Sequence, residues 1–399
     1  MEFNHPVFWV MVAAVAGPLL GQIPLGVKLP IVVIEVLLGI VLGPHGLDRV
    51  RFEGPIASLF TYGMAMTLFM AGMELDFGAI KGRPLKLAAM GWCVSLLLGV
   101  TAVGLLHVIP AVHAPLMVTL ALCTTGLGVL IAVFRDDGLL ETPFGRLIVA
   151  AGTVGEVGPI VAMSLLLSER YSTWQEIGFL LAFIAIVGGA IITGIAARPP
   201  RLLAFLGRQM HASTQLPVRI SLLMLGALFV LADAFGFESI FGAFAAGLVV
   251  GQATHGDDGK PLRDKIDAVA FGFFYPFFFV GTGIKFDIAA LGQNLSTMLM
   301  APAFLILILV IRGFPVFLYR RDIGRAQYVP FALASAVPSL SIVVVITEIG
   351  TRTGSLDPDI ATALVGAALL STMLFPTIAG FLLDRITLSG DGTRKEHAA

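Results

Sequence analysis

The sequence has little charge and almost no cysteine. Asp, Glu, Lys and Arg make up 13% of its 399 residues, whereas 57% are hydrophobic and the mean hydropathy is +0.94. Soluble proteins carry about 25% charged residues, so a soluble chain of this length would lack the charge that its surface needs. The two cysteines, Cys93 and Cys123, lie in apolar runs, which argues against a secreted disulfide framework. A net charge of −1 without a basic stripe argues against nucleic-acid binding, and no dinucleotide-binding glycine motif points to a cofactor.

Apolar runs long enough to cross a membrane occur along the whole chain. A membrane-spanning helix needs about 20 mostly apolar residues. The sequence therefore predicts an all-α polytopic membrane protein with about thirteen transmembrane helices. The predicted spans cover residues 6–24, 29–43, 56–74, 87–108, 114–134, 144–168, 177–197, 218–236, 238–254, 266–284, 296–319, 327–350 and 359–384. The first five residues include no Lys or Arg, so we expect the first run to be retained and not cleaved as a signal peptide.

Lysine and arginine are distributed unevenly between alternate loops. If the N-terminus lies outside, the inside segments hold 19 of the 25 Lys and Arg residues and the outside segments hold 5. Positively charged residues favour the cytoplasmic side of a membrane. We therefore predict an N-terminus outside, a C-terminus inside with a short cytoplasmic tail at 386–399, and a location in the bacterial plasma (inner) membrane.

Two parts of the chain resemble each other at a nearly constant offset. A Gly-x3-Gly pattern at Gly39 recurs at Gly247, and a Gly-x3-Asp-x2-Ala pattern at Gly72 recurs at Gly283, which are offsets of 208 and 211. Seven predicted spans separate the copies, so the copies have opposite orientations. Inverted repeats are typical of secondary transporters, which alternate access around a midplane site. We predict one transmembrane domain over 1–385, made of repeat one (about 29–168), a linker helix (177–197) and repeat two (about 218–384).

One carboxyl group lies at the centre of a predicted span. Glu156 is at the midpoint of the span 144–168, next to Gly155 and close to Pro159. An isolated charge at this depth would cost about 2.5–3.5 kcal/mol on insertion scales, so we expect this carboxyl to be protonated, paired or in contact with a wet cavity. A buried carboxyl can trade a proton for a metal cation near neutral pH. Such an exchange is the minimum chemistry of a cation:proton antiporter.

Three further ionisable residues inside predicted spans are candidates for a role at the site. Arg312 lies about 12 Å deep, by helical rise from the cytoplasmic Arg320, and it stays protonated under physiological conditions. It can stabilise a carboxylate or backbone carbonyls, or extend to the inner membrane surface. Glu35 and Asp233 are secondary candidates, and each is as compatible with a structural role as with ion binding.

Two spans carry residues that interrupt a helix at mid-depth. The span 114–134 has Thr124 and Thr125 beside glycines, and the span 327–350 has Pro338 and Ser339 at its centre. The two segments occupy equivalent places in the two repeats. Interrupted helices at matching positions indicate the binding site of a transporter, because freed carbonyls and helix ends can bind ions. Helix packing through small residues is the alternative interpretation.

Together these motifs resemble the monovalent cation:proton antiporter superfamily, particularly the branch that includes the membrane domains of bacterial potassium-efflux systems. The resemblance runs from Leu29 to Leu383. The residues that carry it are Glu35-x3-Gly39-x3-Gly43-Pro44, Phe69-x2-Gly72-Met73-Glu74-Leu75-Asp76, Thr124-Thr125, Asp137-Gly138-Leu139-Leu140, Gly145-Arg146-Leu147 and Phe277-Phe278-Phe279-Val280-Gly281.

The resemblance implies a core domain with two crossed broken helices and a panel that often forms a homodimer. It also implies that Glu156 is the acidic residue that binds the cation or proton, and that Arg312 occupies the basic position of the family. In such proteins the residue before the acid is often Asp, Asn or Gln. This chain has Gly155 there, so a ligand or a second titratable group is missing.

We therefore predict a secondary active transporter, not an enzyme, that exchanges Na⁺ or K⁺ for H⁺ by alternating access and without net charge movement. Glu156 would bind either ion, hydroxyls or carbonyls around Thr124, Thr125 and Ser339 would complete the shell, and Arg312 would compensate charge. Neither a cofactor nor any metal besides the transported cation is expected. Two alternatives stay open. One is a cation channel or non-transporting sensor on the same bundle, and the other is an organic-anion carrier that uses Arg312 as a ligand.

Overall fold

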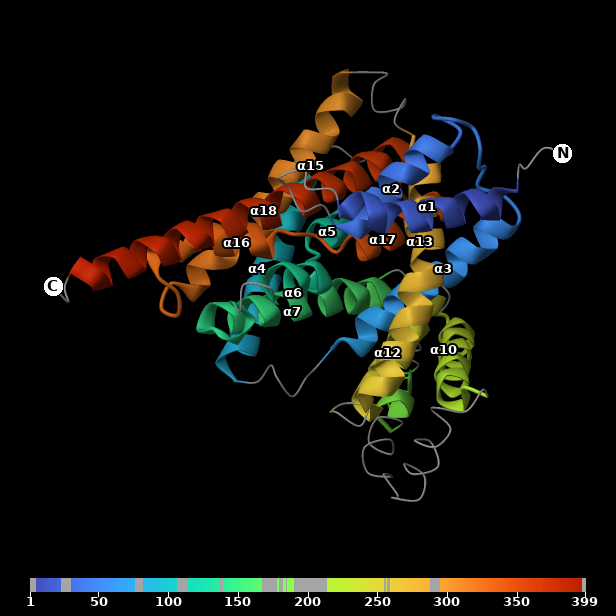
Figure 1. Ribbon diagram of the computed structural model, residues 1–399, viewed down its shortest axis with the longest axis horizontal. Helices are drawn as coiled ribbons and strands as arrows, with labels where there is room; N and C mark the ends of the chain where they lie inside the picture. Colours follow the sequence, from blue (N-terminus) through green and yellow to red (C-terminus); the bar gives the residue numbers. More distant parts are fainter. Residues whose placement is uncertain are drawn as a thin grey trace. The chain divides into compact units, whose positions relative to one another are not determined.

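Every regular secondary-structure element in the part of the chain that the computed structural model describes is a helix (Figure 1). The described residues are 5–22, 30–75, 82–105, 114–135, 139–166, 178, 182–183, 185–189, 214–254, 256, 259–287 and 295–396. The chain divides into two compact units. Unit 1 consists of Met1–Pro18, Glu35–Phe77 and Val161–Lys285, and unit 2 consists of Leu19–Ile34, Gly78–Ile160 and Phe286–Ala399.

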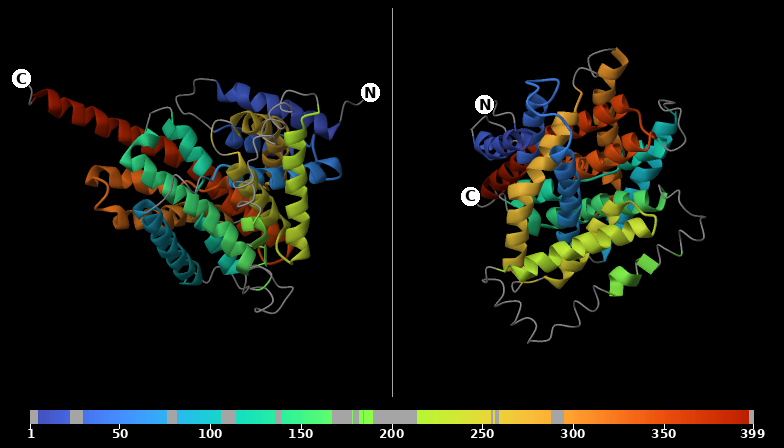
Figure 2. Two further views of the ribbon diagram at one scale, coloured as in Figure 1. Left: turned by 90° about the horizontal axis from the view of Figure 1, so that it is seen from below. Right: turned by 90° about the vertical axis from the view of Figure 1, so that its right-hand side faces the viewer.

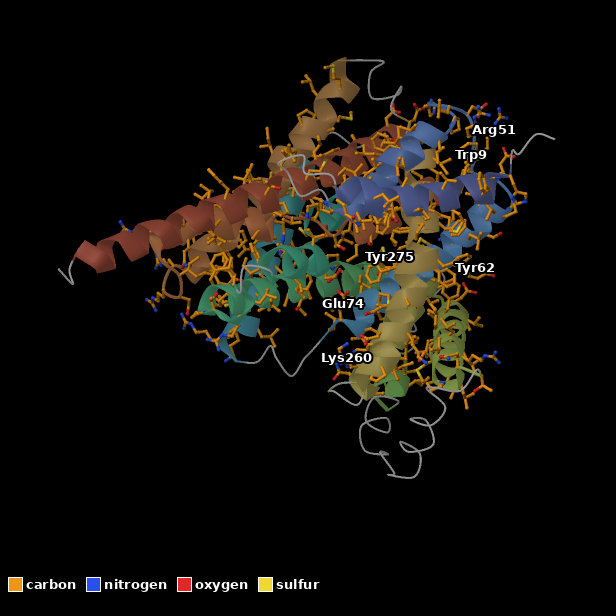
Figure 3. The ribbon with its side chains drawn as sticks, in the orientation of Figure 1. Trp9, Arg51, Tyr62, Glu74, Lys260 and Tyr275 are labelled. Atoms are coloured by element: carbon orange, nitrogen blue, oxygen red, sulfur yellow. The ribbon has the colours of Figure 1, made fainter. Side chains whose placement is uncertain are left out.

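Unit 1 is built around a central apolar helix, α3 (Pro55–Met73). Most of α3 is buried, as is typical of a helix that is apolar all round, and it packs against α11 (Ser239–Ala253) and α13 (Tyr275–Lys285). Tyr62 on α3 and Tyr275 at the start of α13 mark these two helices in Figure 3. The remaining elements of the unit are α10 (Leu216–Ala234), α12 (Lys260–Val269), the π-helical turn η3 (Ala270–Phe274) and most of α1 (Pro6–Gly21) and α2 (Ile31–Leu42).

The glycines of α2 bring its backbone into contact with α13. A Cβ atom at Gly39 would lie 2.2 Å from the carbonyl oxygen of Val280, and a Cβ atom at Gly283 would lie 2.0 Å from the carbonyl oxygen of Val36. Real Cβ contacts are not this short, so these two positions require glycine.

The helices α3 and α11 cross in the same way. A Cβ atom at Gly72 would lie 2.2 Å from the carbonyl oxygen of Phe244, and a Cβ atom at Gly247 would lie 1.9 Å from the carbonyl oxygen of Phe69. The glycine motifs of the sequence are thus the contact points of two close helix crossings, as small residues are in many membrane proteins. We call the α2–α13 and α3–α11 contacts the glycine crossings.

Unit 2 contains two helices that stop and restart. The first pair is α5 (Ala114–Leu122) and α6 (Leu127–Arg135), and the second pair is α16 (Tyr328–Ser335) and α17 (Leu340–Arg352). The second pair bends by 41° at its break. Both breaks lie where the sequence predicts them. Pro338 explains the second one, because proline disfavours helical backbone at the residue before it.

Longer helices of unit 2 surround these two pairs. The helix α15 (Leu295–Gly313) packs against α4 (Arg83–Leu105), α16 and α18 (Pro358–Glu396), and α18 also contacts α6 and α17. Figure 2 shows α18 in red, running to the C-terminal end. This helix continues beyond the predicted span end at 384. The other elements are η1 (Leu139–Glu141), most of α7 (Pro143–Leu166), η4 (Phe314–Tyr319) and η5 (Arg325–Gln327).

Helices or helix pairs coincide with every predicted span except 177–197, most of which lies outside the described residues. Seven described helices are individually long and apolar enough to cross a membrane, or eight if the bent pair α16–α17 counts as one span. Several other spans are shorter or broken, so the number thirteen stays a prediction.

A two-pronged ion pair joins the start of α4 to the segment that follows η4 in unit 2. Nε and Nη2 of Arg83, at the start of α4, donate to the two carboxylate oxygens of Asp322 at 2.7 and 2.9 Å. The hydrogen bonds from Arg83 lower the pKa of the Asp322 carboxyl.

Candidate functional site

The two helix breaks of unit 2 touch each other through their backbones. The amide of Gly126 donates to the carbonyl of Val337 at 2.9 Å. A Cβ atom at Gly126 would lie only 2.8 Å from the carbonyl oxygen of Pro338, so glycine permits this approach. We call the contact between Cys123–Gly126 and Ala336–Ser339 the broken crossing.

The buried carboxyl of Glu156 lies beside the broken crossing. The amide of Thr125 donates to the carbonyl of Gly155 on α7 at 2.9 Å, which holds the first break against the helix turn that carries Glu156. The carboxyl is 6% exposed, and the hydroxyl of Ser339 donates to its Oε1 at 3.4 Å. Ser339 is the residue that precedes α17. The N-terminus of α17 therefore lies beside Glu156, and the positive end of its helix dipole would stabilise a carboxylate there.

The guanidinium of Arg312 is buried at the same crossing, with 4% of the residue exposed. Its Nε and Nη2 donate to the hydroxyl of Thr125 at 2.9 and 2.5 Å. Longer bonds of 3.3–3.4 Å run from Nη1 to the hydroxyl of Ser95, from Nε to the carbonyl of Ser335 and from Nη2 to the carbonyl of Ala151. These partners belong to α4, the first break, the end of α16 and α7. Arg312 therefore stays buried at the crossing.

Arg312 also compensates the end of a broken helix. Ser335 is the last residue of α16, where the helix dipole leaves a partial negative charge on the free carbonyls. The carbonyl of Ser335 accepts bonds from the Thr125 hydroxyl at 2.8 Å and from Arg312 at 3.4 Å. A fixed cation at this position replaces the missing helical hydrogen bonds and counters the dipole.

Gly155 makes room for this arrangement. A Cβ atom at position 155 would lie 2.7 Å from Nη2 of Arg312 and 2.7 Å from Oγ1 of Thr125. Both distances are shorter than ordinary contacts, so a side chain here would displace the guanidinium or the first break. The space in which resembling sequences place a polar side chain is therefore filled in this chain by Arg312 and Thr125.

Unit 2 contains most of the residues that the sequence nominates, namely Glu156, Thr124, Thr125, Ser339, Arg312 and Gly155. Gly155 is a secondary candidate of the sequence, and the other two secondary candidates belong to unit 1. Glu35 is buried on the apolar helix α2, and Asp233 is exposed in the last turn of α10. The contacts of Arg312, Ser339 and Thr125 thus connect residues of unit 2, whereas Glu35 and Asp233 belong to unit 1.

Sequence reasoning misses the hydroxyl of Ser95 and the carbonyls of Ser335 and Ala151 as partners of Arg312. Ser95 is a polar residue within an apolar run, which is a weak signal, and Ser335 lies in the segment flagged as a break. Backbone acceptors carry no signal in a sequence. Across the described residues, no three His, Cys, Asp or Glu side chains gather in a way that could hold a metal ion.

Known proteins resemble this chain over nearly its whole length. The family profile described as "Sodium/hydrogen exchanger, transmembrane" matches residues 10–385. YjbQ of Bacillus subtilis is 24% identical over 373 residues, which are 88% of this chain and 58% of YjbQ, so the chain spans less than two thirds of that relative. The Na⁺/H⁺-K⁺ antiporter GerN of Bacillus cereus is 24% identical over 390 residues, which are 94% of this chain and 95% of GerN.

A solved structure shares the fold. The sodium proton antiporter MjNhaP1 from Methanocaldococcus jannaschii superimposes with a TM-score of 0.63 at 19% identity, covering 96% of this chain and 98% of that one. The family profile covers nearly the whole chain, and the relatives and the fold agree with it. The chain belongs to the sodium/hydrogen exchanger family of integral membrane proteins.

Proposed function

We propose that this protein is a secondary active transporter that exchanges a monovalent cation, Na⁺ or K⁺, for H⁺. The observation that carries the proposal is the buried carboxyl of Glu156 beside the contact of two broken helices. The family to which the chain belongs and the names of its relatives agree with such an exchange. A carboxyl in this position binds a proton or a cation but not both, which couples the two fluxes.

The cation shell is formed by Glu156 with oxygens of the broken crossing. The hydroxyl of Ser339 already contacts Oε1 of Glu156, and the two lone pairs of that hydroxyl can bind a cation. The hydroxyl of Thr124 is fully buried at the first break and donates to the carbonyl of Ala121 at 2.9 Å. Oxygen ligands of this kind suit hard cations such as Na⁺ and K⁺.

The exchange is one-for-one and electroneutral. Arg312 is always protonated, so the pair of Arg312 and ionised Glu156 has no net charge. One bound H⁺ or one bound monovalent cation adds the same single charge, and a cycle that swaps them moves no net charge across the membrane. Gly155 has no titratable side chain, so it adds no second proton-binding group to this exchange. The guanidinium already has several protein partners, which disfavours a role as the ligand of an organic anion.

Transport proceeds by alternating access. Unit 2 is the core domain that the family resemblance implies, and its movement exposes Glu156 first to one side of the membrane and then to the other. Unit 1 is the panel, through which two copies of the chain associate as a homodimer in the bacterial inner membrane. The N-terminus lies outside and the C-terminus in the cytoplasm, in agreement with the distribution of Lys and Arg.

The inverted repeat is part of this proposal, with about thirteen spans in all. Its support comes from the glycine crossings, which correspond to each other at the offsets of the sequence repeat. The contact of Gly39 with Val280 corresponds to that of Gly247 with Phe69, and the contact of Gly283 with Val36 corresponds to that of Gly72 with Phe244. The contact of α2 in repeat one with α13 in repeat two thus matches the contact of α11 in repeat two with α3 in repeat one. This correspondence is expected for two copies related by a pseudo-two-fold axis.

Proteoliposomes that contain the purified protein and a pH-sensitive dye test the function. After a pH gradient is imposed, addition of Na⁺ or K⁺ should collapse the gradient, and an imposed membrane potential should leave the final state unchanged. Absence of a response to Na⁺, K⁺ and Li⁺ across pH 6–9 would refute cation:proton exchange. A final state that moves with the potential would refute electroneutrality, and a cation current without proton flux would indicate a channel.

A further inference from the structure

The two adjacent threonines of the first break have different partners. Thr125 Oγ1 donates to the carbonyl of Ser335 at 2.8 Å and accepts from Nε and Nη2 of Arg312 at 2.9 and 2.5 Å. Thr124 Oγ1 donates to the carbonyl of Ala121 at 2.9 Å. Both threonines are fully buried, so neither hydroxyl can rely on bulk water.

The number of hydrogen bonds decides which of the two can bind a cation. A threonine hydroxyl has one hydrogen and two lone pairs. Thr125 uses its hydrogen on Ser335 and both lone pairs on Arg312, whereas the bond from Thr124 to Ala121 uses only the hydrogen. A cation ligand must offer a lone pair. Thr124 has lone pairs to offer, and Thr125 has none while Arg312 is in place.

We propose that Thr125 is a positioning residue that holds Arg312, and that it does not bind the transported cation. The inference rests on the proposed function and refines it, because it divides the two threonines between charge compensation and ion binding. Gly155 belongs to the same device, since a Cβ atom there would lie 2.7 Å from both Arg312 Nη2 and Thr125 Oγ1. Thr125 accepts the shortest bonds of the guanidinium and ties it to the end of α16.

This division predicts different kinetic effects at neighbouring positions. Thr125→Val removes both lone pairs that Arg312 uses, and loss of hydrogen bonds to a buried charged group should lower the maximal exchange rate about tenfold or more. The cation concentration at half-maximal rate should change by less than about twofold, because no ligand is lost. Thr125→Ser keeps the hydroxyl and should retain most of the activity. Thr124→Val removes a ligand and should raise the half-maximal concentration about tenfold.

The experiment measures Na⁺- and K⁺-dependent dye dequenching for these three variants in proteoliposomes, together with unfolding temperatures in detergent. A double-mutant cycle with Arg312→Met tests the contact itself. Thr125→Val should lower the unfolding temperature of the wild-type protein clearly, but by about a third of that amount or less in the Arg312→Met background, where only the bond to Ser335 is lost.

The inference is overturned if Thr125→Val raises the half-maximal cation concentration as much as Thr124→Val does. It is also overturned if Thr125→Val lowers the unfolding temperature equally in both backgrounds, since Thr125 and Arg312 would then act independently. A wild-type protein that exchanges no ions would instead refute the proposed function. The unfolding cycle would still decide whether Thr125 holds Arg312, so the two failures can be told apart.

Discussion

Unit 1 and unit 2 both bring helices from the two halves of the sequence into backbone contact, but they use different residues to do so. The glycine crossings of unit 1 join helices that continue without a break through the point of contact. The broken crossing of unit 2 joins interrupted helices, and hydroxyls, carbonyls and a buried guanidinium replace the missing helical bonds. In the interior of a continuous helix the carbonyls accept helical hydrogen bonds, so a crossing there offers an ion fewer free carbonyls than a break does. The comparison indicates why unit 1 is suited to structural support and unit 2 to ion binding.

The largest expected effect is on the folding of unit 1. Gly247→Ala places a Cβ atom 1.9 Å from the carbonyl oxygen of Phe69, so α3 and α11 must separate. Overpacking of this kind costs about 1–3 kcal/mol or more, and we expect a large loss of folded protein and a lower unfolding temperature. Gly226→Ala is the matched control, because a Cβ atom there meets nothing within 4 Å. If both variants fold equally well, the glycine crossings do not hold unit 1 together.

The second largest expected effect is a lower exchange rate when the broken crossing is disturbed. Gly126→Ala places a Cβ atom 2.8 Å from the carbonyl oxygen of Pro338, which pushes the two breaks apart by several tenths of an ångström. We expect the protein to fold and the exchange rate to fall about tenfold or more, because ion ligands must be held within about 0.5 Å of their productive geometry. Gly104→Ala, at an unobstructed position on α4, should exchange ions like the wild type. Equal rates for the two variants would show that contact of the breaks is not needed for transport.

The smallest expected effect is a slightly lower unfolding temperature when the ion pair of Arg83 and Asp322 in unit 2 is removed. The pKa of Asp322 is lowered by its bonds to Arg83, so its stabilising contribution is present above the ordinary pKa of about 4 and is lost as the pH falls below that value. Asp322→Asn should therefore lower the unfolding temperature slightly at pH 7, and the difference from wild type should shrink as the pH falls below 4. A difference that is constant with pH would contradict a role for the ion pair.

The sequence predicts much of this site because buried charge and helix breakers are rare in apolar spans. Glu156 and Arg312 are conspicuous for their cost in lipid, and Pro338 and the glycines beside Thr124 mark the breaks. The pairing of Gly39 with α13 and of Gly247 with α3 could not be predicted from the repeat. A repeat shows which segments correspond, but it does not show which segments touch.

The sequence also could not predict that neighbouring residues have different roles. Thr124 and Thr125 are chemically identical and adjacent, and only the directions of their hydroxyls separate them. The sequence presents Gly155 as a missing ligand, whereas the structure fills its space with Nη2 of Arg312 and Oγ1 of Thr125. Such distinctions depend on distances of a few tenths of an ångström, which residue types and spacing do not determine.

The most direct test of the account compares two buried carboxyls, one in each unit. Both Glu156 and Glu35 are almost inaccessible to solvent, but the account assigns ion binding to Glu156 alone. In proteoliposomes with a pH-sensitive dye, Glu156→Gln should abolish Na⁺- and K⁺-dependent dequenching, while Glu35→Gln, a matched change in unit 1, should retain most of it. Dequenching that survives in Glu156→Gln, or that is lost only in Glu35→Gln, would contradict the central claim.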